Sequence, residues 1–280
     1  MKILKTFVRE FSGDTETPIT LFYKYVGNEK GFLLESRGEG KTNYSFMGKH
    51  PMAILSGNDK LTIDEKGKKT VVEGKLLDSV RDYMKGFKIE TDLDLCYTGG
   101  AVGYDIIRQY ENIPDTNKEV VGTPTVHLMV FDEFIAYDHL HDKIILVALA
   151  EKEEDAIPVL DRMEREIKTS VPEEHYALQP TKKIQFTSNM TEEKYEEIVE
   201  KAKKYIYDGD IFQVVLSQRL TAETDQKPID LYRKLRAINP SPYLLYLNFG
   251  DYQVAGSSPE MLVEVSGNKV KTCPIAGTRK

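Results

Sequence analysis

The chain has 280 residues, enough for about two domains of the usual ~100–200 residues. Hydrophobic residues make up 40% of the chain and charged residues 30%, proportions typical of a globular protein. The formal net charge is −7 and no stripe of Lys and Arg alternates with aromatic residues, which argues against a nucleic-acid partner. No apolar run approaches the ~20 residues of a membrane-spanning helix, so we expect no membrane partner.

Cysteine and histidine spacing gives no metal-binding or disulfide pattern. Cys96 and Cys273 are too far apart to form a metal-ligand motif or a disulfide framework. His139 and His141 fall in a predicted hairpin turn, where we expect solvated side chains rather than metal ligands. The N-terminus is too short and too charged for a signal peptide. Together these features predict a reduced, cytoplasmic location.

Strand patterns dominate the first ~150 residues. Residues 60–64 and 69–73 alternate around a Gly-containing turn, which predicts a hairpin. Apolar residues at helical spacing, from Leu77 to Met84, predict a helix after this hairpin. Further strands are predicted over residues 46–48, 53–56, 126–131, 134–137 and 143–148.

The pattern then changes to a helix and a linker. Residues 151–168 have one apolar face, and Asp155 is the predicted N-cap. Residues 169–188 lose this periodicity and contain prolines, which indicates a domain boundary. We therefore predict an N-terminal domain over residues 1–170 and a second domain over residues 186–280.

The second domain alternates helices and strands. Thr191 is the predicted N-cap of a helix that ends at Gly209. Residues 211–217 form an apolar, strand-like run that carries Gln213. Another helix is predicted over residues 228–238, before Pro240. The remaining strands are predicted over residues 243–248, 252–256, 261–265 and 269–274.

Four motifs each have a structural and a functional interpretation when taken alone. Thr98-Gly-Gly-Ala-Val-Gly-Tyr104 fits no nucleotide-binding pattern, so close backbone packing is the better interpretation. Gln213 is either a buried, satisfied amide or a site residue. Glu260 is either a surface carboxylate or an acid in a drier site. Pro274-Ile-Ala-Gly-Thr-Arg279 is either a turn or a group of N–H donors and a hydroxyl that holds a carboxylate.

Taken together and in order, the motifs resemble those of anthranilate synthase large subunits, within the chorismate-utilising enzyme family. The matching segments are Thr17-Pro18, Leu33-Leu-Glu-Ser36, Tyr44-Ser-Phe-Met-Gly48, residues 97–104, Gly209-Asp-Ile-Phe-Gln-Val-Val215, Asn239-Pro-Ser-Pro-Tyr243, Ser258-Pro-Glu260 and residues 274–279. They cover essentially the whole chain, and the C-terminal set is highly specific. The resemblance implies an α+β fold in which antiparallel β-sheet layers carry helices on the outside.

The resemblance also implies a reaction. Family members convert chorismate to anthranilate with Mg²⁺ and ammonia, which a glutamine amidotransferase partner subunit usually supplies. By analogy Glu260 is the general acid that helps the ring hydroxyl to leave, and Gly277 and Thr278 contact chorismate.

Aminodeoxychorismate synthases often carry Lys at the position of Ala276, and isochorismate and salicylate synthases carry Lys at the position of Gln213. Alanine offers no amine and an amide is no base, so both residues favour anthranilate synthase; aminodeoxychorismate synthase is the enzymatic alternative.

A second set of residues resembles the feedback site for L-tryptophan. Glu35 and Ser36 match one wall of that site, and Pro242, Tyr243 and Leu244 match the other. The family usually has Met in place of Leu244, an apolar exchange of similar volume. The loop at residues 37–43 is shorter than the family pattern and lacks its Trp. Tryptophan bound in a pocket that bridges both sheet systems is expected to favour a less active arrangement.

Family members continue well beyond Lys280. The Mg²⁺ ligands and a catalytic His are therefore expected outside this sequence, with no metal ligand within it. We expect a truncated product or an expressed fragment that is inactive alone, with open edges on the strands at 211–217 and 243–274. The alternative from another functional class is a binding module that binds only tryptophan or the amidotransferase.

Overall fold

The computed structural model describes residues 1–36, 43–91, 93, 98–116, 118–170 and 184–273. By their contacts the residues form two units, Met1–Glu174 with Leu231–Lys280, and His175–Asp230. The predicted N-terminal domain, residues 1–170, lies in the first unit. The predicted second domain, residues 186–280, is divided between the two, and its functional boundary stays a prediction.

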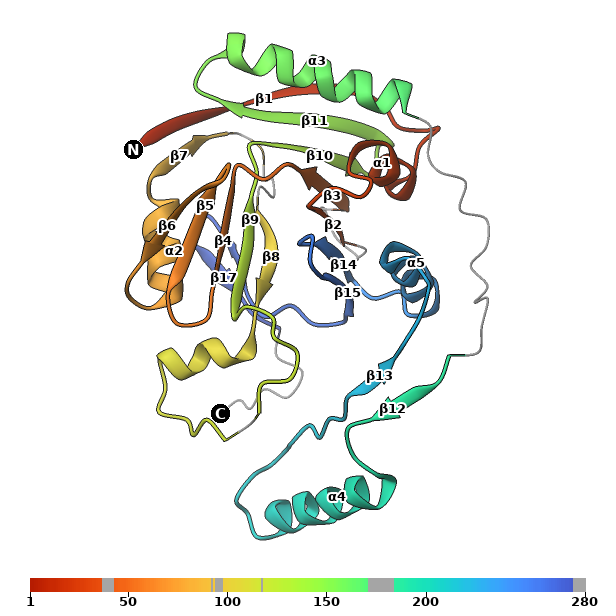
Figure 1. The fold of residues 1–280 in the computed structure, drawn as a ribbon. Helices are drawn as coiled ribbons and strands as arrows, with labels where there is room; N and C mark the ends of the chain where they lie inside the picture. Colours follow the sequence, from red (N-terminus) through yellow and green to blue (C-terminus); the bar gives the residue numbers. More distant parts are fainter. Residues whose placement is uncertain (37–42, 92, 94–97, 117, 171–183, 274–280) are drawn as a thin grey trace. The chain divides into compact units, whose positions relative to one another are not determined.

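An eight-stranded sheet forms the larger layer of the first unit (Figure 1). Its strands, in spatial order, are β15 (Gln253–Ser258), β14 (Tyr243–Asn248), β2 (Gly31–Ser36), β3 (Tyr44–Lys49), β10 (Glu133–Asp138), β11 (Lys143–Ala150), β1 (Lys2–Ser12) and β7 (Phe87–Glu90). All neighbours are antiparallel except β1 and β7. The predicted open edges on the strands at 243–274 are wrong for β14, which pairs with β2 on one side and β15 on the other, whereas β15 forms one edge of the described sheet.

A five-stranded antiparallel sheet forms the second layer of this unit. Its order is β6 (Lys68–Val72), β5 (Leu61–Glu65), β4 (Ala53–Gly57), β9 (Val126–Val130) and β8 (Thr98–Val102). The predicted hairpin at 60–73 is confirmed as β5 and β6. The predicted helix follows as α2 (Leu76–Met84), whose Leu76 is fully buried against Leu55 and Leu61 of this sheet. A 3-10 helix, η1 (Tyr104–Gln109), follows β8.

The two sheets meet through a shared apolar cluster. Phe32 of β2 packs in this cluster with Phe131, at 4.8 Å between ring centroids. Gly99 of β8 lies so close that a Cβ atom there would stand 2.8 Å from Cγ of Phe32. Gly99 therefore serves close packing between the sheets, and Gly100 close packing on the neighbouring strand β9, which confirms the predicted close backbone packing. The expected α+β class, with antiparallel layers and helices on the outside, is also confirmed.

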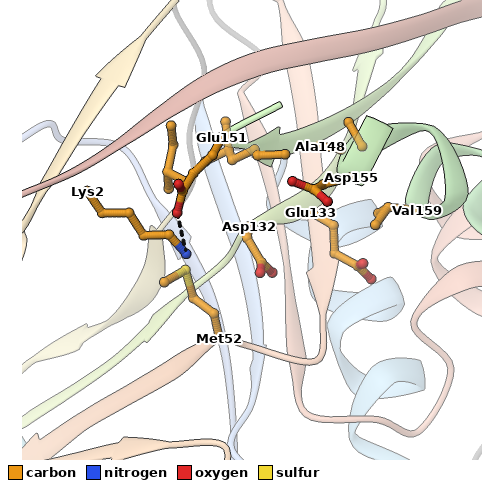
Figure 2. Close-up of a pocket in the computed structure, with 12 residues that line it drawn as sticks. Lys2, Met52, Asp132, Glu133, Ala148, Glu151, Asp155 and Val159 are labelled. Carbon is orange, nitrogen blue, oxygen red and sulfur yellow. Dashed lines mark ion pairs between the residues drawn. The ribbon is translucent and has the colours of Figure 1, made fainter. Parts of the chain in front are cut away.

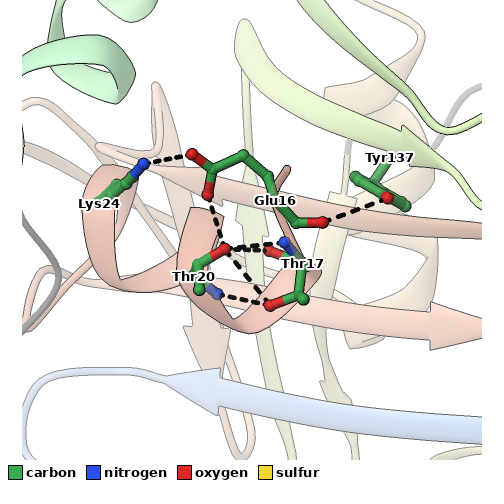
Figure 3. A network of polar contacts seen from close by, with 5 residues as sticks. All are labelled: Glu16, Thr17, Thr20, Lys24 and Tyr137. Atoms are coloured by element: carbon green, nitrogen blue, oxygen red, sulfur yellow. Dashed lines mark hydrogen bonds and ion pairs between the residues drawn. The ribbon is translucent and has the colours of Figure 1, made fainter. Parts of the chain in front are cut away.

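The first helix, α1 (Pro18–Tyr25), is fixed by its N-terminal cap. Thr17 accepts a hydrogen bond from the backbone N–H of Thr20, and Thr20 accepts one from the backbone N–H of Thr17. Glu16 accepts from the Thr20 hydroxyl at 2.7 Å and pairs with Lys24 one turn further on (Figure 3). The Tyr137 hydroxyl donates to the Glu16 carbonyl at 3.3 Å, which ties the cap to β10. This reciprocal cap satisfies N–H groups that no helical carbonyl reaches.

The helix predicted over 151–168 is confirmed as α3 (Glu153–Thr169), which covers β1 and β11 (Figure 1). Lys152, not Asp155, occupies the N-cap, because Asp155 already lies in the first helical turn. Three of the four buried side chains of α3 are Leu160, Met163 and Ile167, at the helical spacing that predicted its apolar face.

A buried carboxylate also holds α3 to the sheet. Glu133 of β10 accepts a hydrogen bond from the Tyr25 hydroxyl at 3.0 Å and pairs with Arg162 of α3. Burial, reinforced by the Glu133 charge, raises the pKa of Tyr25 well above its ordinary value of 10.0. We call these three residues the Glu133 clamp.

The second unit contains β12 (Phe186–Ser188), β13 (Leu220–Ala222) and α4 (Glu192–Tyr207). Thr191 caps α4 as predicted, because its side chain accepts from the backbone N–H of Lys194 at 3.2 Å. The predicted strand at 211–217 is wrong: residues 211–219 form no regular element, and Phe212 is 96% exposed. An apolar run becomes a strand only when another strand accepts its hydrogen bonds, and none of the described strands pairs with it.

The helix predicted at 228–238 is confirmed as α5 (Pro228–Ile238), which starts in the second unit and continues into the first. A short hairpin, β16 (Glu264–Ser266) and β17 (Lys269–Lys271), follows β15. None of the described helices has the length and apolar character needed to cross a bilayer.

Candidate functional site

The two predicted walls of the tryptophan site are neighbouring strands. Ser36, the last residue of β2, lies opposite Tyr243, the first residue of β14, and Glu35 lies opposite Leu244. Pro242 directly precedes β14. Two segments that are far apart in the sequence thus meet on neighbouring strands within the eight-stranded sheet.

The pleat of the sheet divides the predicted residues between its two faces. Directly paired residues project to the same face and successive residues to opposite faces, so Ser36 goes with Tyr243 and Glu35 with Leu244. The Glu35 face is closed, because Glu35 is only 2% exposed and Leu244 only 1%. The Ser36 face is more open, because Tyr243 is 37% exposed. A small ligand can therefore meet the side chains of Ser36 and Tyr243 together, but not all of the predicted side chains at once.

Helix α5 supplies the partners of Glu35. Arg236 donates from Nε to Oε1 at 2.7 Å and from Nη2 to Oε2 at 2.9 Å, which is a two-pronged ion pair. The Tyr232 hydroxyl donates to Oε1 of the same carboxylate at 2.5 Å. We call Glu35, Tyr232 and Arg236 the Glu35 clamp. Sequence patterns gave no role to Tyr232 or Arg236, although their four-residue spacing places them on one helix face.

The clamp continues into the neighbouring strand. Ser45 of β3, which is fully buried, lies 3.5 Å from Oε2 of Glu35 and 2.7 Å from Nε2 of His139. His139 lies in the turn as predicted, but its ring is half-buried and contacts Ser45, so its side chain is only partly solvated. The prediction fits His141, whose side chain is 60% exposed and contacts Asp138.

The Ser36 face is apolar beyond the hydroxyl groups of Ser36, Tyr243 and Ser258, the last of which pairs with Tyr243 from β15. Leu34 and Leu245 are half-buried there, next to the cluster that joins the sheets. Gly256 of β15 lies opposite Leu245, and a Cβ atom on it would come within 3.1 Å of Cγ of Leu245. Hydroxyl groups at the edge of a half-buried apolar surface can orient a ligand that has both a flat ring and a polar end.

The two predicted catalytic residues belong to different units, Glu260 to the first and Gln213 to the second. Glu260 is exposed just after β15, where its backbone N–H donates to the Ser258 hydroxyl at 3.3 Å. Gln213 is exposed in the second unit. The predicted chorismate contacts Ala276, Gly277 and Thr278 lie outside the described residues.

A separate cavity of about 270 Å³ lies where β1, β10, β11 and α3 meet (Figure 2). Its lining includes four carboxylates, Asp132, Glu133, Glu151 and Asp155. Lys2 pairs with Glu151 at 3.4 Å, and Glu133 belongs to its own clamp. Across the described residues, no group of three or more His, Cys, Asp or Glu side chains is arranged to hold a metal ion.

Comparison with known proteins identifies relatives. The family model for chorismate binding enzymes matches residues 29–280. Anthranilate synthase component 1 of Acetivibrio thermocellus is 44% identical over 294 residues, covering 97% of this chain and 59% of that protein. Aminodeoxychorismate synthase component 1 of Bacillus subtilis is 34% identical over 255 residues, covering 88% of this chain and 54% of that protein.

The fold has a solved relative as well. The crystal structure of anthranilate synthase component I from Streptococcus pneumoniae matches with a TM-score of 0.72 and 31% identity, over 84% of this chain and 56% of that one. The chain thus spans less than two thirds of the length of these relatives. Because the family match extends over most of its length, the chain belongs to the family of chorismate binding enzymes.

Proposed function

We propose that the protein acts as component I of an anthranilate synthase. In this reaction ammonia adds to the chorismate ring, the ring hydroxyl leaves as water, and pyruvate is eliminated to give anthranilate. Support comes from the relatives of that name, which align along nearly the whole chain. The protein is then a lyase of tryptophan biosynthesis in the cytoplasm, supplied with ammonia by a glutamine amidotransferase subunit.

Glu260 is the proposed general acid, because hydroxide is a poor leaving group and needs a proton. Gln213 carries an amide that cannot act as a base, which disfavours activation of water at that position. Gly277, Thr278 and Ala276 are the proposed chorismate contacts. Mg²⁺ is the cofactor implied by the family, but no described residues form a fitting donor set, so we derive no step through it.

Aminodeoxychorismate synthase is the second candidate, since a relative of that name is 34% identical. Ala276 favours anthranilate synthase, because it has no amine that could attack the ring. Identification of the product by mass and fluorescence separates the two: anthranilate supports the first proposal, and 4-amino-4-deoxychorismate supports the second.

We further propose that L-tryptophan binds at Ser36 and Tyr243 as a feedback inhibitor. The single observation that carries this proposal is the direct pairing of Ser36 with Tyr243 on the open face of the sheet. Pro242 and the backbone of Leu244 complete the pocket. Tryptophan would inhibit by binding one of two arrangements of the enzyme more tightly than the other.

The binding test exploits the composition of the chain, which contains no Trp. The fluorescence anisotropy of free L-tryptophan is followed while the folded chain is added. We expect saturable binding that Ser36→Arg abolishes and that Ser12→Arg, an exposed strand-end control on β1, leaves intact. Absence of saturable binding, or equal loss in both variants, would contradict the pocket.

An activity test addresses the 280 residues alone. We propose that they bind ligand without turning over chorismate, since Glu260 and Gln213 are both exposed. Chorismate, ammonium and Mg²⁺ are incubated with the chain while anthranilate fluorescence is recorded, and we expect no increase above the protein-free control. Turnover that Glu260→Gln removes would overturn the proposed inactivity and support the assignment of the acid.

A further inference from the structure

We propose that Arg236 and Tyr232 are positioning residues for the ligand pocket, and that they act through the carboxylate of Glu35. This inference rests on the proposed tryptophan site at Ser36 and Tyr243. It assigns Glu35 a supporting role in place of the direct ligand contact expected from the sequence.

Both oxygens of the Glu35 carboxylate already accept hydrogen bonds from other side chains of the protein. The Glu35 side chain is 0% exposed, and both oxygens accept hydrogen bonds from Arg236 while Oε1 also accepts from Tyr232. A ligand ammonium would have to displace a two-pronged guanidinium contact inside the fold. Leaving a buried carboxylate without its arginine partner costs free energy. The ion pair between Glu35 and Arg236 is therefore more stable than an arrangement in which a ligand replaces Arg236.

The clamp is linked through the chain to each half of the pocket. Glu35 directly precedes Ser36 on β2. Arg236 lies in the last turn of α5, and the turn that follows leads straight into Tyr243. The Ser257 hydroxyl donates to the Asn239 carbonyl at 2.7 Å, which holds that turn against β15. One contact between α5 and β2 therefore restrains the separation of the two hydroxyl groups that face the ligand.

The Glu133 clamp provides an internal control with the same chemistry. There too a Tyr hydroxyl and an Arg guanidinium from helices bind one buried strand carboxylate. Glu133 is 8% exposed, against 2% for Glu35, so loss of the arginine leaves a buried carboxylate in each case. The two arginine variants should therefore lose comparable stability. Only the Glu35 clamp adjoins the pocket.

The experiment compares Arg236→Gln with Arg162→Gln in the full chain. Both are checked by circular dichroism and urea unfolding, and tryptophan affinity is measured by ligand anisotropy. We expect Arg236→Gln to raise the Kd by about tenfold or more, and Arg162→Gln to change it by less than about twofold. Arg236→Lys should recover part of the affinity, because it keeps the charge but not the two-pronged geometry.

Unchanged affinity in a folded Arg236→Gln chain would overturn the proposal, as would equal weakening by Arg162→Gln. If the unaltered chain does not bind tryptophan, the proposed tryptophan site is refuted. Amide hydrogen exchange then tests the positioning role of the Glu35 clamp separately. Arg236→Gln should then speed exchange at residues 243–245 while Arg162→Gln does not. Equal exchange in the two variants would refute positioning independently of any ligand.

Discussion

His127 of β9 lies in an aromatic group at the junction of the two sheets. Its ring stacks on Phe249, with 3.9 Å between ring centroids, and its Nδ1 atom lies 2.7 Å from the Tyr252 hydroxyl. Burial lowers the pKa of His127 from 6.5 to about 4, and the charge of Lys30 acts in the same direction. The ring is therefore neutral at pH 7, and the fold is expected to lose stability when acid favours the imidazolium.

The sign follows from proton uptake by the two states. Between pH 6.5 and about 4 the unfolded chain binds a proton at His127 that the folded chain does not, so stability falls as the pH falls through this window. A pKa change from 6.5 to about 4 corresponds to roughly 3 kcal/mol. The ring is only half-buried, so solvent screening reduces the expected loss to about 1–2 kcal/mol.

Urea unfolding at pH 7.0 and 4.5 measures this loss, and a His127→Asn variant isolates it. Asn offers the Tyr252 hydroxyl a hydrogen-bond partner near the place of Nδ1 but does not titrate. The control is His50→Asn, which removes an exposed ring at a positive φ of 54° that Asn tolerates. We expect the pH-dependent loss to shrink by about 1–2 kcal/mol only in the His127 variant. The same pH dependence in His127→Asn and the unaltered chain would refute the reasoning.

Two further predictions concern packing and capping. Gly99→Ala should lower the free energy of unfolding by about 1–3 kcal/mol, because its Cβ would stand 2.8 Å from Phe32; an unchanged urea midpoint would show that the sheets can move apart freely. Thr17→Ala should cost about 1 kcal/mol through loss of the reciprocal cap of α1, whereas Thr17→Ser should retain most of it. Thermal unfolding compares Thr17→Ala with Thr17→Ser, and equal Tm values for these two variants would argue against a stabilising role of the cap.

Local sequence patterns determined the elements whose stabilising contacts are close in the chain. The hairpin of β5 and β6 follows from alternation around one turn, and α3 and α4 follow from helical periodicity. Helix hydrogen bonds join residues four apart, so the sequence window that forms them is also the window that predicts them. The cap of α3 was misassigned by a few residues because several acidic residues crowd its first turn.

The run at 211–217 shows the limit of such patterns. Its β-branched and aromatic residues favour a strand, yet residues 211–219 are irregular. Strand propensity has effect only when a partner strand accepts the hydrogen bonds, and local sequence carries no information about that partner. The same dependence produced the opposite outcome for β14, which gained a neighbour on each side.

The sequence by itself, through its ordered motifs, determined the family and predicted that Ser36 and Tyr243 share one ligand pocket. The tertiary structure decided which of the predicted side chains can act together. Strand register placed Ser36 and Tyr243 on the open face and turned Glu35 to the closed face, where Arg236, 201 residues away, holds its carboxylate. Pairing register and burial are long-range properties of the folded chain, and a shift of one residue would reverse every side-chain assignment.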